Sequence, residues 1–245
     1  MSKLTKLQNL KEKYHNCTAC ALGVQRSSRG ANIVFGEGNI DAKIMVIGES
    51  PGPQEEENNM PLYPHAPSGE LFAKFLTHIN VKREDVFITN SMICAPLTDK
   101  KTVMLAPDKA KIFGSPATKT GAMYACNQRL LNTIDIIKPN VIVLLGSIAY
   151  TALFGSAPKT VTNSLGKHVW NNYNCYLTYH PSFYARKKSF AKSNEEQKEL
   201  VDLTLIIKSH WEEIKKLSEI EKISNQYDEL KETLKISKVL KEQKT

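Results

Sequence analysis

Four short segments of the chain are almost wholly apolar, without the alternation with polar residues that marks a strand exposed on one face. Continuous apolar runs of this length are typical of strands that are buried on both faces of a sheet. We therefore predict strands at residues 43–49, 86–90, 141–146 and 175–180.

Between these strands, apolar residues recur at the spacing of an amphipathic helix. Residues 68–80 predict one helix, with Ser68 as its N-cap. Residues 126–137 and 147–154 predict two more, and Gly155 closes the second of these. Strands that alternate with helices indicate right-handed crossovers, and hence an α/β fold with a parallel sheet covered by helices on both faces.

Polar residues follow the predicted strands at one edge of this sheet. The first strand runs into Gly-Glu-Ser-Pro-Gly at residues 48–52, and the second ends at Asn90. The third leads into Gly-Ser at 146–147, and the fourth into His-Pro-Ser at 180–182. Because ligands of parallel sheets bind beyond the carboxyl ends of the strands, these segments predict a functional site.

Two regions fit this pattern poorly. Residues 99–121 are rich in lysine, proline and glycine and predict a loop insertion. From about Asn194 onward the chain is rich in Glu and Lys, with apolar residues at helical spacing. We interpret its first part as the last helix of a domain at residues 1–212, followed by a charged helical tail at 213–245. A solvated helix is the simpler interpretation of the tail, and binding of a replication or polymerase partner is the alternative.

The composition narrows the class of protein. Of the 245 residues 41% are apolar, enough for a buried core, and 33 Lys and Arg against 25 Asp and Glu leave a formal charge of +8. Such a surplus favours a polyanionic partner such as nucleic acid, although lysine-rich proteins in general show it too. We find no apolar run of the roughly 18 residues that span a membrane and no signal-peptide core, so we expect a cytoplasmic protein, or a nucleoplasmic one if the host has a nucleus, without membrane contact. We also expect a monomer.

Five cysteines in a reducing compartment indicate metal binding or catalysis before disulfides. Cys17 and Cys20 form a close pair, whereas Cys94 and Cys126 stand alone. A structural zinc site usually has two close pairs, but an iron–sulfur cluster tolerates wider scatter. The pair alone could equally be a redox motif or chance. Cys175 lies inside a predicted strand, where a buried inert thiol is expected.

Several segments together resemble the family 4, iron–sulfur-containing uracil-DNA glycosylases, in the same order along residues 14–212. They are RGANIVFGEG at 29–38, KIMVIGESPG at 43–52, Asn90 with Cys94 four residues on, Gly146-Ser147, and His180-Pro181-Ser182. The resemblance implies a three-layer αβα sandwich over a four-stranded parallel sheet. It also implies a repair enzyme that hydrolyses the N-glycosidic bond of uracil in DNA and leaves an abasic site. Its cofactor would be a 4Fe–4S cluster held by Cys17, Cys20, Cys94 and Cys126.

The resemblance also implies roles at the strand ends. The target nucleotide must leave the base stack and enter a pocket. Asn90 would bind the Watson–Crick edge of uracil, and His180 would donate a hydrogen bond to uracil O2 as negative charge develops there. Glu49 would orient the attacking water or stabilise the cationic sugar. The remaining substrate-binding candidates shape the pocket and approach the DNA backbone: Gly48, Ser50, Pro51, Gly52 and Ser182.

The chain departs from the family where an aromatic side chain stacks on the base. The family has Phe thirteen residues after the Glu, and here that position is Leu62, followed by Tyr63. Either Leu62 forms a flatter wall or Tyr63 takes over the stacking. After the His-Pro-Ser motif, Phe183 and Tyr184 with Arg186 predict a wedge that enters the DNA minor groove, and local packing of these aromatics is the alternative.

A binding module is the main competing function: a glycosylase fold that acts as a DNA-binding or polymerase-associated factor with little catalysis. The altered aromatic position and the lysine-rich insertion favour it. The joint presence of Glu49, Asn90 and His180 favours the enzyme, because a protein that only binds DNA does not need all three.

Overall fold

The computed structural model describes residues 1–97 and 121–220. Two expected segments therefore lie outside the described residues, namely the insertion at 99–121 apart from Gly121, and the tail beyond 220. No helix in the described part is long and apolar enough to cross a membrane.

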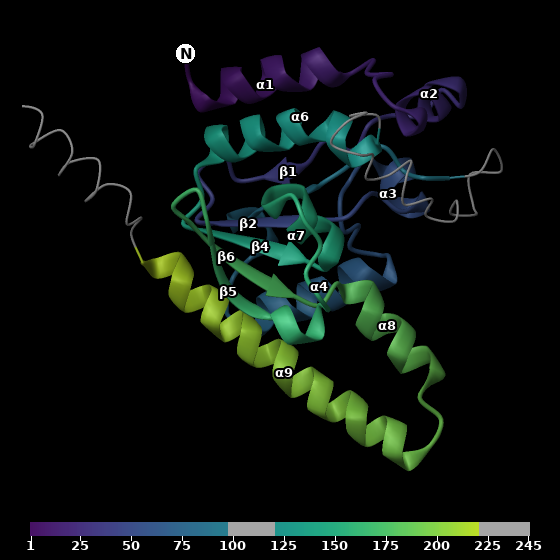
Figure 1. Cartoon of the computed structure of the whole chain (residues 1–245), viewed down its shortest axis with the longest axis vertical. Coiled ribbons are helices and arrows are strands. Elements are labelled where there is room, and N and C mark those ends of the chain that lie inside the picture. The colour runs from purple at the N-terminus through teal and green to yellow at the C-terminus, as the bar shows by residue number, and fades with distance from the viewer. Residues whose placement is uncertain (98–120, 221–245) are drawn as a thin grey trace, which may run out of the picture.

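The sheet has a parallel centre and two antiparallel edges (Figure 1). Its order is β1-β3-β2-β4-β6-β5, and the four central strands are parallel, as predicted. The strands are β1 (Glu37–Gly38), β2 (Ile44–Gly48), β3 (Phe87–Asn90), β4 (Val141–Leu145), β5 (Gly166–Trp170) and β6 (Tyr173–Thr178). The expectation of four strands missed both edges. β1 has only two residues, and β5 alternates between half-buried and exposed positions, so neither forms an apolar run.

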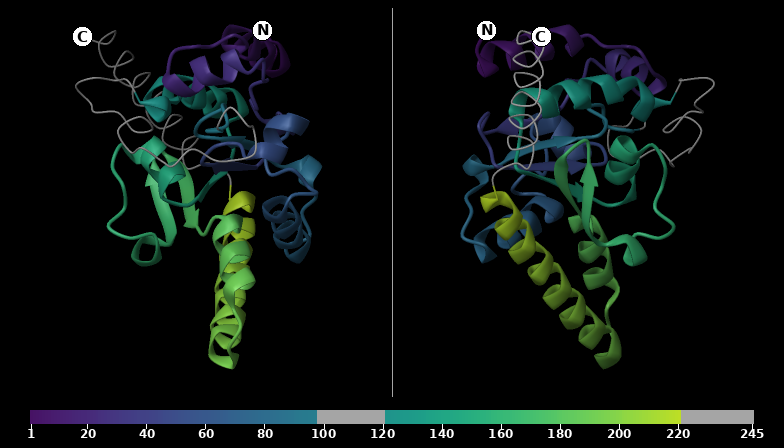
Figure 2. Two further views of the ribbon diagram at one scale, coloured as in Figure 1. Left: turned by 90° about the vertical axis from the view of Figure 1, so that its right-hand side faces the viewer. Right: turned by 60° about the vertical axis from the view of Figure 1, so that its left-hand side comes forward.

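Helices cover both faces of this sheet, which makes the expected αβα sandwich (Figures 1 and 2). They are α1 (Lys3–Tyr14), α2 (Ala21–Ser28), α3 (Pro53–Asn58), α4 (Pro67–His78), α6 (Ala122–Ile137), α7 (Ser147–Phe154), α8 (Pro181–Phe190) and α9 (Asn194–Glu219), with 3₁₀ turns η1 (Arg83–Asp85) and η2 (Thr162–Ser164). Helices α6 and α7 pack on one face, with α1 outside α6, and α4 and α9 pack on the other.

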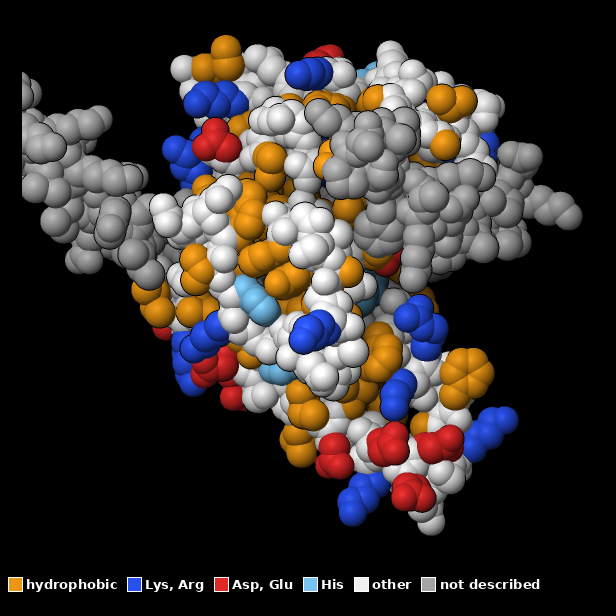
Figure 3. Space-filling model, in the orientation of Figure 1, with side chains coloured by type: hydrophobic (Ala, Val, Ile, Leu, Met, Phe, Trp, Pro, Cys, Tyr) orange, Lys and Arg blue, Asp and Glu red, His pale blue; other side chains and the backbone are white. Residues whose placement is uncertain are grey.

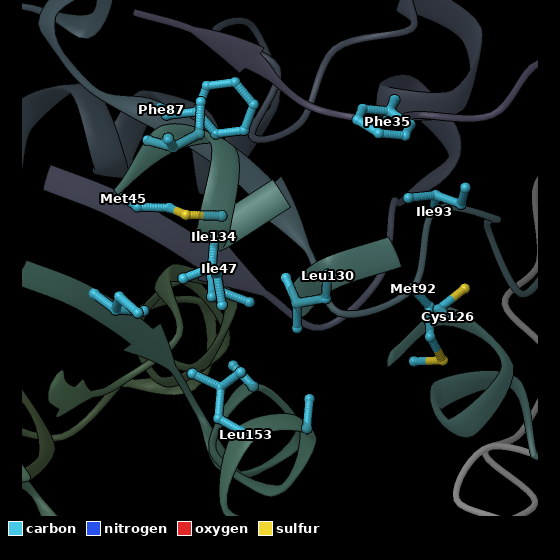
Figure 4. Close-up of a cluster of buried hydrophobic side chains, with 14 of the residues drawn as sticks. Phe35, Met45, Ile47, Phe87, Met92, Ile93, Cys126, Leu130, Ile134 and Leu153 are labelled. Atoms are coloured by element: carbon cyan, nitrogen blue, oxygen red, sulfur yellow. The ribbon is translucent and has the colours of Figure 1, made fainter. Parts of the chain in front are cut away.

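The strands send alternate apolar side chains to these two faces. In β2, Met45 and Ile47 join the cluster under α6, whereas Ile44 and Val46 join the cluster under α9. Figure 4 shows the first pair beside side chains of α6. We call the side covered by α6 and α7 the cysteine face, because its cluster contains three buried cysteines, Cys94, Cys126 and Cys175. The other side is the α9 face.

Helix α9 buries one stripe of apolar residues against the sheet. Its buried side chains recur every three or four residues: Leu203, Ile207, Trp211, Ile214, Leu217. The Trp211 ring lies between Phe72 and Phe75 of α4, at centroid distances of 5.6 and 6.0 Å. Burying an aromatic side chain of this size stabilises the fold by about 2–3 kcal/mol. Because this stripe continues to Leu217, the expected domain boundary at residue 212 falls inside α9.

Element boundaries shift where proline begins a helix. Pro67 starts α4, and the N-cap is Ala66. The prediction of Ser68 as the N-cap was therefore wrong. Pro181 starts α8 in the same way, and β6 ends at Thr178, two residues before the predicted end. The missing N–H of proline costs nothing in the first helical turn, which makes these starts favourable. His180 thereby becomes the N-cap of α8.

Candidate active site

A cavity of about 500 Å³ lies at the carboxyl ends of the central strands. The segments after three strands supply its walls: Glu49, Ser50 and Gly52 after β2; Gly146 and Ser147 after β4; Tyr179, His180, Ser182, Phe183 and Arg186 after β6. Gly146 has φ +87°, which a side chain would disfavour, and this turn lets Ser147 begin α7 at the cavity. The structure therefore brings Glu49, Ser50, Gly52, His180 and Ser182 to one cavity, whereas Gly48, Pro51 and Asn90 are not among the residues that line it.

Gly48 allows two polar side chains to approach the same point. Gly48 pairs with Asn90 in the register of β2 and β3. A Cβ atom at Gly48 would collide with Asn90 Oδ1 and would lie 3.8 Å from His180 Nε2. The absent side chain thus leaves the space in which the Asn90 amide and the His180 ring face one another.

The Asn90 amide has an unused hydrogen-bond donor. The residue is only 3% exposed, and its Nδ2 has no hydrogen-bond partner within the described residues. A buried amide without a partner costs about 1–3 kcal/mol, which a ligand carrying an acceptor would recover. Asn90 is therefore arranged to recognise a polar ligand.

The imidazole of His180 is held as a neutral donor. Its Nδ1 accepts the Ser182 main-chain N–H at 3.1 Å and lies 2.8 Å from Ser182 Oγ. Acceptance at Nδ1 places the proton of a neutral ring on Nε2, the atom that faces Asn90. Burial, aided by the nearby charge of Arg186, lowers the pKa of His180 to about 4. At neutral pH the site thus has an uncharged Nε2–H donor.

Glu49 supplies a carboxyl group in the same cavity. Burial raises the pKa of Glu49, and the charge of Arg186 acts in the opposite direction. Arg186 itself lines the cavity and influences the pKa of both Glu49 and His180. A carboxyl group with a raised pKa is suited to proton transfer or to interaction with a developing positive charge.

Leu62 and Tyr63 are not among the residues that line this cavity. Leu62 is 3% exposed and packs in the cluster of the α9 face, with a left-handed backbone at φ +46°. Its N–H donates to Glu55, and its carbonyl accepts from Arg83 at 3.1 Å. The Tyr63 ring packs edge-on against His65 at 5.4 Å.

The aromatic side chains at the cavity are Tyr179 and Phe183, whose rings stack at 5.0 Å with an interplanar angle of 13°. Sequence reasoning overlooked Tyr179, although it directly precedes His180. Tyr184, the other predicted wedge residue, lies instead against α9, where its hydroxyl is 2.9 Å from Thr204 Oγ1. The turn from α8 to α9 carries acidic and basic side chains next to one another rather than a continuous cationic surface (Figure 3).

The four cysteines of the predicted cluster lie within reach of one another's charge. Burial, together with the charges of Cys126, Cys20 and Cys17, raises the pKa of Cys94 to about 12, and the charge of Arg26 acts in the opposite direction. Cys175 is buried elsewhere on the same face, as expected for an inert thiol, and its pKa is also about 12. Among residues 1–97 and 121–220, no group of three or more His, Cys, Asp or Glu side chains is arranged to hold a metal ion.

Comparisons with known proteins identify the family of the chain. The model of the uracil DNA glycosylase superfamily matches residues 35–204. A type-4 uracil-DNA glycosylase of Thermotoga maritima is 31% identical over 185 residues, which is 75% of this chain and 85% of the relative. One from Pyrobaculum aerophilum is 32% identical over 209 residues, covering 79% and 91%. One from Saccharolobus solfataricus is 31% identical over 186 residues, covering 72% and 76%.

Proposed function

Because the chain belongs to the type-4 uracil-DNA glycosylases of the uracil-DNA glycosylase superfamily, we propose that it removes uracil from DNA by hydrolysis of the N-glycosidic bond. The reaction leaves an abasic site and is the first step of repair. The observation that carries this proposal is the pair of groups above Gly48: an amide with an unused donor and a neutral imidazole N–H.

Asn90 reads the edge of the extruded base. Its Nδ2 donates to uracil O4, and its Oδ1 accepts the N3–H of uracil. Cytosine presents the opposite donor and acceptor at these positions, so an Asn90 amide that keeps this orientation has both of its groups left unpaired. The discrimination therefore follows from the cost of buried groups without partners.

His180 stabilises the leaving group. As the bond between C1′ and the base breaks, negative charge accumulates on uracil, and the Nε2–H donates to O2. A neutral donor is suited to this task because it is aimed in advance and does not transfer its proton to the base. Loss of one such donor typically lowers kcat by about 10²–10³-fold.

Glu49 acts on the other side of the breaking bond. Its carboxylate orients the attacking water or stabilises the cationic sugar. Gly48, Ser50, Pro51, Gly52 and Ser182 shape the pocket around the nucleotide. Tyr179 and Phe183 form the aromatic wall for the base, in place of the side chain that the family carries where this chain has Leu62. Arg186 contacts the DNA backbone.

The proposal includes a 4Fe–4S cluster on Cys17, Cys20, Cys94 and Cys126. Each of the four cysteines that hold such a cluster binds a different iron atom. The four cysteine Sγ atoms therefore do not have to converge on one point, as the ligands of a single ion do. The other three thiols each raise the pKa of Cys94, which supports this set. The charges of Arg26 beside Cys94 and of Arg129 beside Cys126 would offset the negative charge of the cluster. When bound, the cluster braces the surrounding segments and takes no part in bond cleavage.

A DNA-binding factor with weak catalysis is the second candidate. The observation that favours it is the position of Leu62, which lies in the core of the α9 face rather than at the cavity.

Cleavage of a labelled oligonucleotide separates these two functions. The purified protein is incubated with an end-labelled strand that carries one uracil, and alkali then cuts any abasic site. We expect cleavage by the native chain, a 10²–10³-fold slower reaction with His180→Ala, and little change with the matched variant His78→Ala, whose ring pairs with Glu212 away from the cavity. DNA binding without cleavage by the native chain would contradict the enzyme and support the binding factor.

A further inference from the structure

Arg129 is a fully buried cation at the end of the strand that carries Asn90. It belongs to α6 and is 0% exposed. Its Nη1 donates to Thr89 Oγ1 at 3.1 Å, and its Nη2 donates to the carbonyl oxygens of Asn90 at 2.6 Å and Ser91 at 2.9 Å. One guanidinium group thus binds three consecutive residues, Thr89 and Asn90 at the end of β3 and Ser91 directly after it.

The Arg129 side chain also lies near two of the proposed cluster ligands, Cys126 and Cys94. Cys126 precedes Arg129 by three residues and therefore shares its face of α6, and the two side chains interact electrostatically. Arg129 also interacts with the charge of Cys94, and its guanidinium lies over the Phe35 ring at 5.7 Å. Arg129 is therefore the side chain that connects the predicted cluster ligands with the end of β3.

These bonds fix the direction of the Asn90 side chain. The Ser91 N–H and Oγ both donate to the Gly48 carbonyl at 2.9 Å, which holds the chain from the side of β2. Arg129 holds the carbonyls of Asn90 and Ser91 from the side of α6. The peptide group that follows Asn90 is thus held at both ends, its carbonyl oxygen by Arg129 and its N–H by the Gly48 carbonyl, and this sets the direction in which the Asn90 side chain leaves the main chain.

We infer that Arg129 is a positioning residue. By holding the main chain of Asn90, it couples base recognition to the four proposed cluster ligands, Cys17, Cys20, Cys94 and Cys126. The inference rests on the proposed function, because it takes Asn90 as the group that reads uracil. Arginine is required, since its planar fork donates several hydrogen bonds in fixed directions, whereas the ammonium of lysine is a single point.

A double-mutant cycle separates this role from a general structural one. We expect Arg129→Lys to lower kcat/KM for uracil DNA about tenfold. In an Asn90→Ala background the same substitution should cost less than about twofold, because the group it orients is gone. Equal losses in the two backgrounds, or no loss in the native one, would overturn the inference.

Arg26→Lys is the matched control. Arg26 is also buried on the cysteine face, where it donates to the carbonyls of Ala31 and Cys17 at 2.7 and 3.2 Å, and it does not bond to β3. Its effect on kcat/KM should therefore be the same with and without Asn90. Non-additivity of the same size for Arg26 and Arg129 would contradict a specific link between Arg129 and Asn90.

Two measurements do not depend on turnover. Iron content and visible absorbance report the cluster, and hydrogen exchange reports the amides of residues 88–93. In folded Arg129→Lys we expect exchange of these amides to be at least about tenfold faster, with the amides of α9 unchanged. Unchanged exchange at 88–93 would overturn the inference. If the native chain failed to excise uracil while exchange still responded to Arg129, the proposed function would fail and the anchoring of β3 would stand.

Discussion

Both faces of the sheet bury a cluster of apolar side chains, but they differ in what else they bury. The α9 face packs aromatic and aliphatic groups around Trp211. The cysteine face also encloses two arginines and the thiols of Cys94 and Cys126. Buried polar groups are costly unless they are bonded, and both arginines donate to main-chain carbonyls near functional segments. The α9 face thus stabilises the fold by apolar packing, whereas the cysteine face also anchors the end of β3 beside Asn90.

The largest effect is expected on the α9 face. Trp211→Ala removes a fully buried ring and should lower the free energy of unfolding by about 3–5 kcal/mol. Urea denaturation measures this loss, and uracil excision per folded molecule should stay near the native value. Val201→Ala on the exposed side of α9 should change stability by less than about 0.5 kcal/mol. A strong loss of activity in folded Trp211→Ala would break the division between the two faces.

The next effect is expected on the cysteine face. Cys94→Ala should abolish most of the visible iron absorbance and lower kcat/KM by about 10- to 100-fold, because the cluster ligands and the end of β3 are connected. Cys175→Ala is the matched control, since this thiol is also buried on the same face. Equal iron content in the two variants would refute the proposed ligand set.

A smaller effect concerns pH. The pKa of His180 is about 4 in the folded protein, against an ordinary value of 6.5 in the unfolded chain. Between these values the unfolded chain binds a proton that the folded chain does not, so stability is complete above pH 6.5 and falls as the pH is lowered toward 4. We expect the free energy of unfolding to be on the order of 1–2 kcal/mol lower at pH 5 than at pH 7.

Denaturation of His180→Gln at both pH values tests the source of this dependence. The variant should lose the part that comes from His180 and keep the parts from other shifted groups, such as His210 on the α9 face, whose pKa burial lowers, and Glu49, whose pKa burial raises. An unchanged pH dependence in His180→Gln would assign the effect to other groups.

The smallest effect is expected at Tyr184. Tyr184→Phe removes the hydroxyl that meets Thr204 and should cost about 1 kcal/mol of stability, with cleavage of uracil DNA unchanged. Phe183→Ala should instead slow cleavage, because Phe183 lines the cavity. Slower cleavage by Tyr184→Phe at native stability would restore Tyr184 as a residue that contacts DNA.

Much of the fold follows from local patterns. The structure confirms the four central strands, which were predicted from short apolar runs, and α7 begins and ends where its pattern predicts. Strand-end motifs also located Glu49, Asn90 and His180, because parallel strands place their carboxyl ends at one edge. The strand β5 was missed because an edge position requires no apolar run.

The sequence by itself determined the parallel centre of the sheet, the family and the candidate polar groups of the site, because each depends on residues that are close along the chain. Only the tertiary structure decided which groups face one another. Either Leu62 or Tyr63 was expected at the base, yet contacts with Glu55 and Arg83 hold Leu62 in the core, and the Tyr63 ring packs against His65. Arg129 was overlooked, although a cation on the apolar side of a helix was visible in the sequence. Its partners lie about 40 residues away, and no local pattern encodes a contact that long-range packing creates.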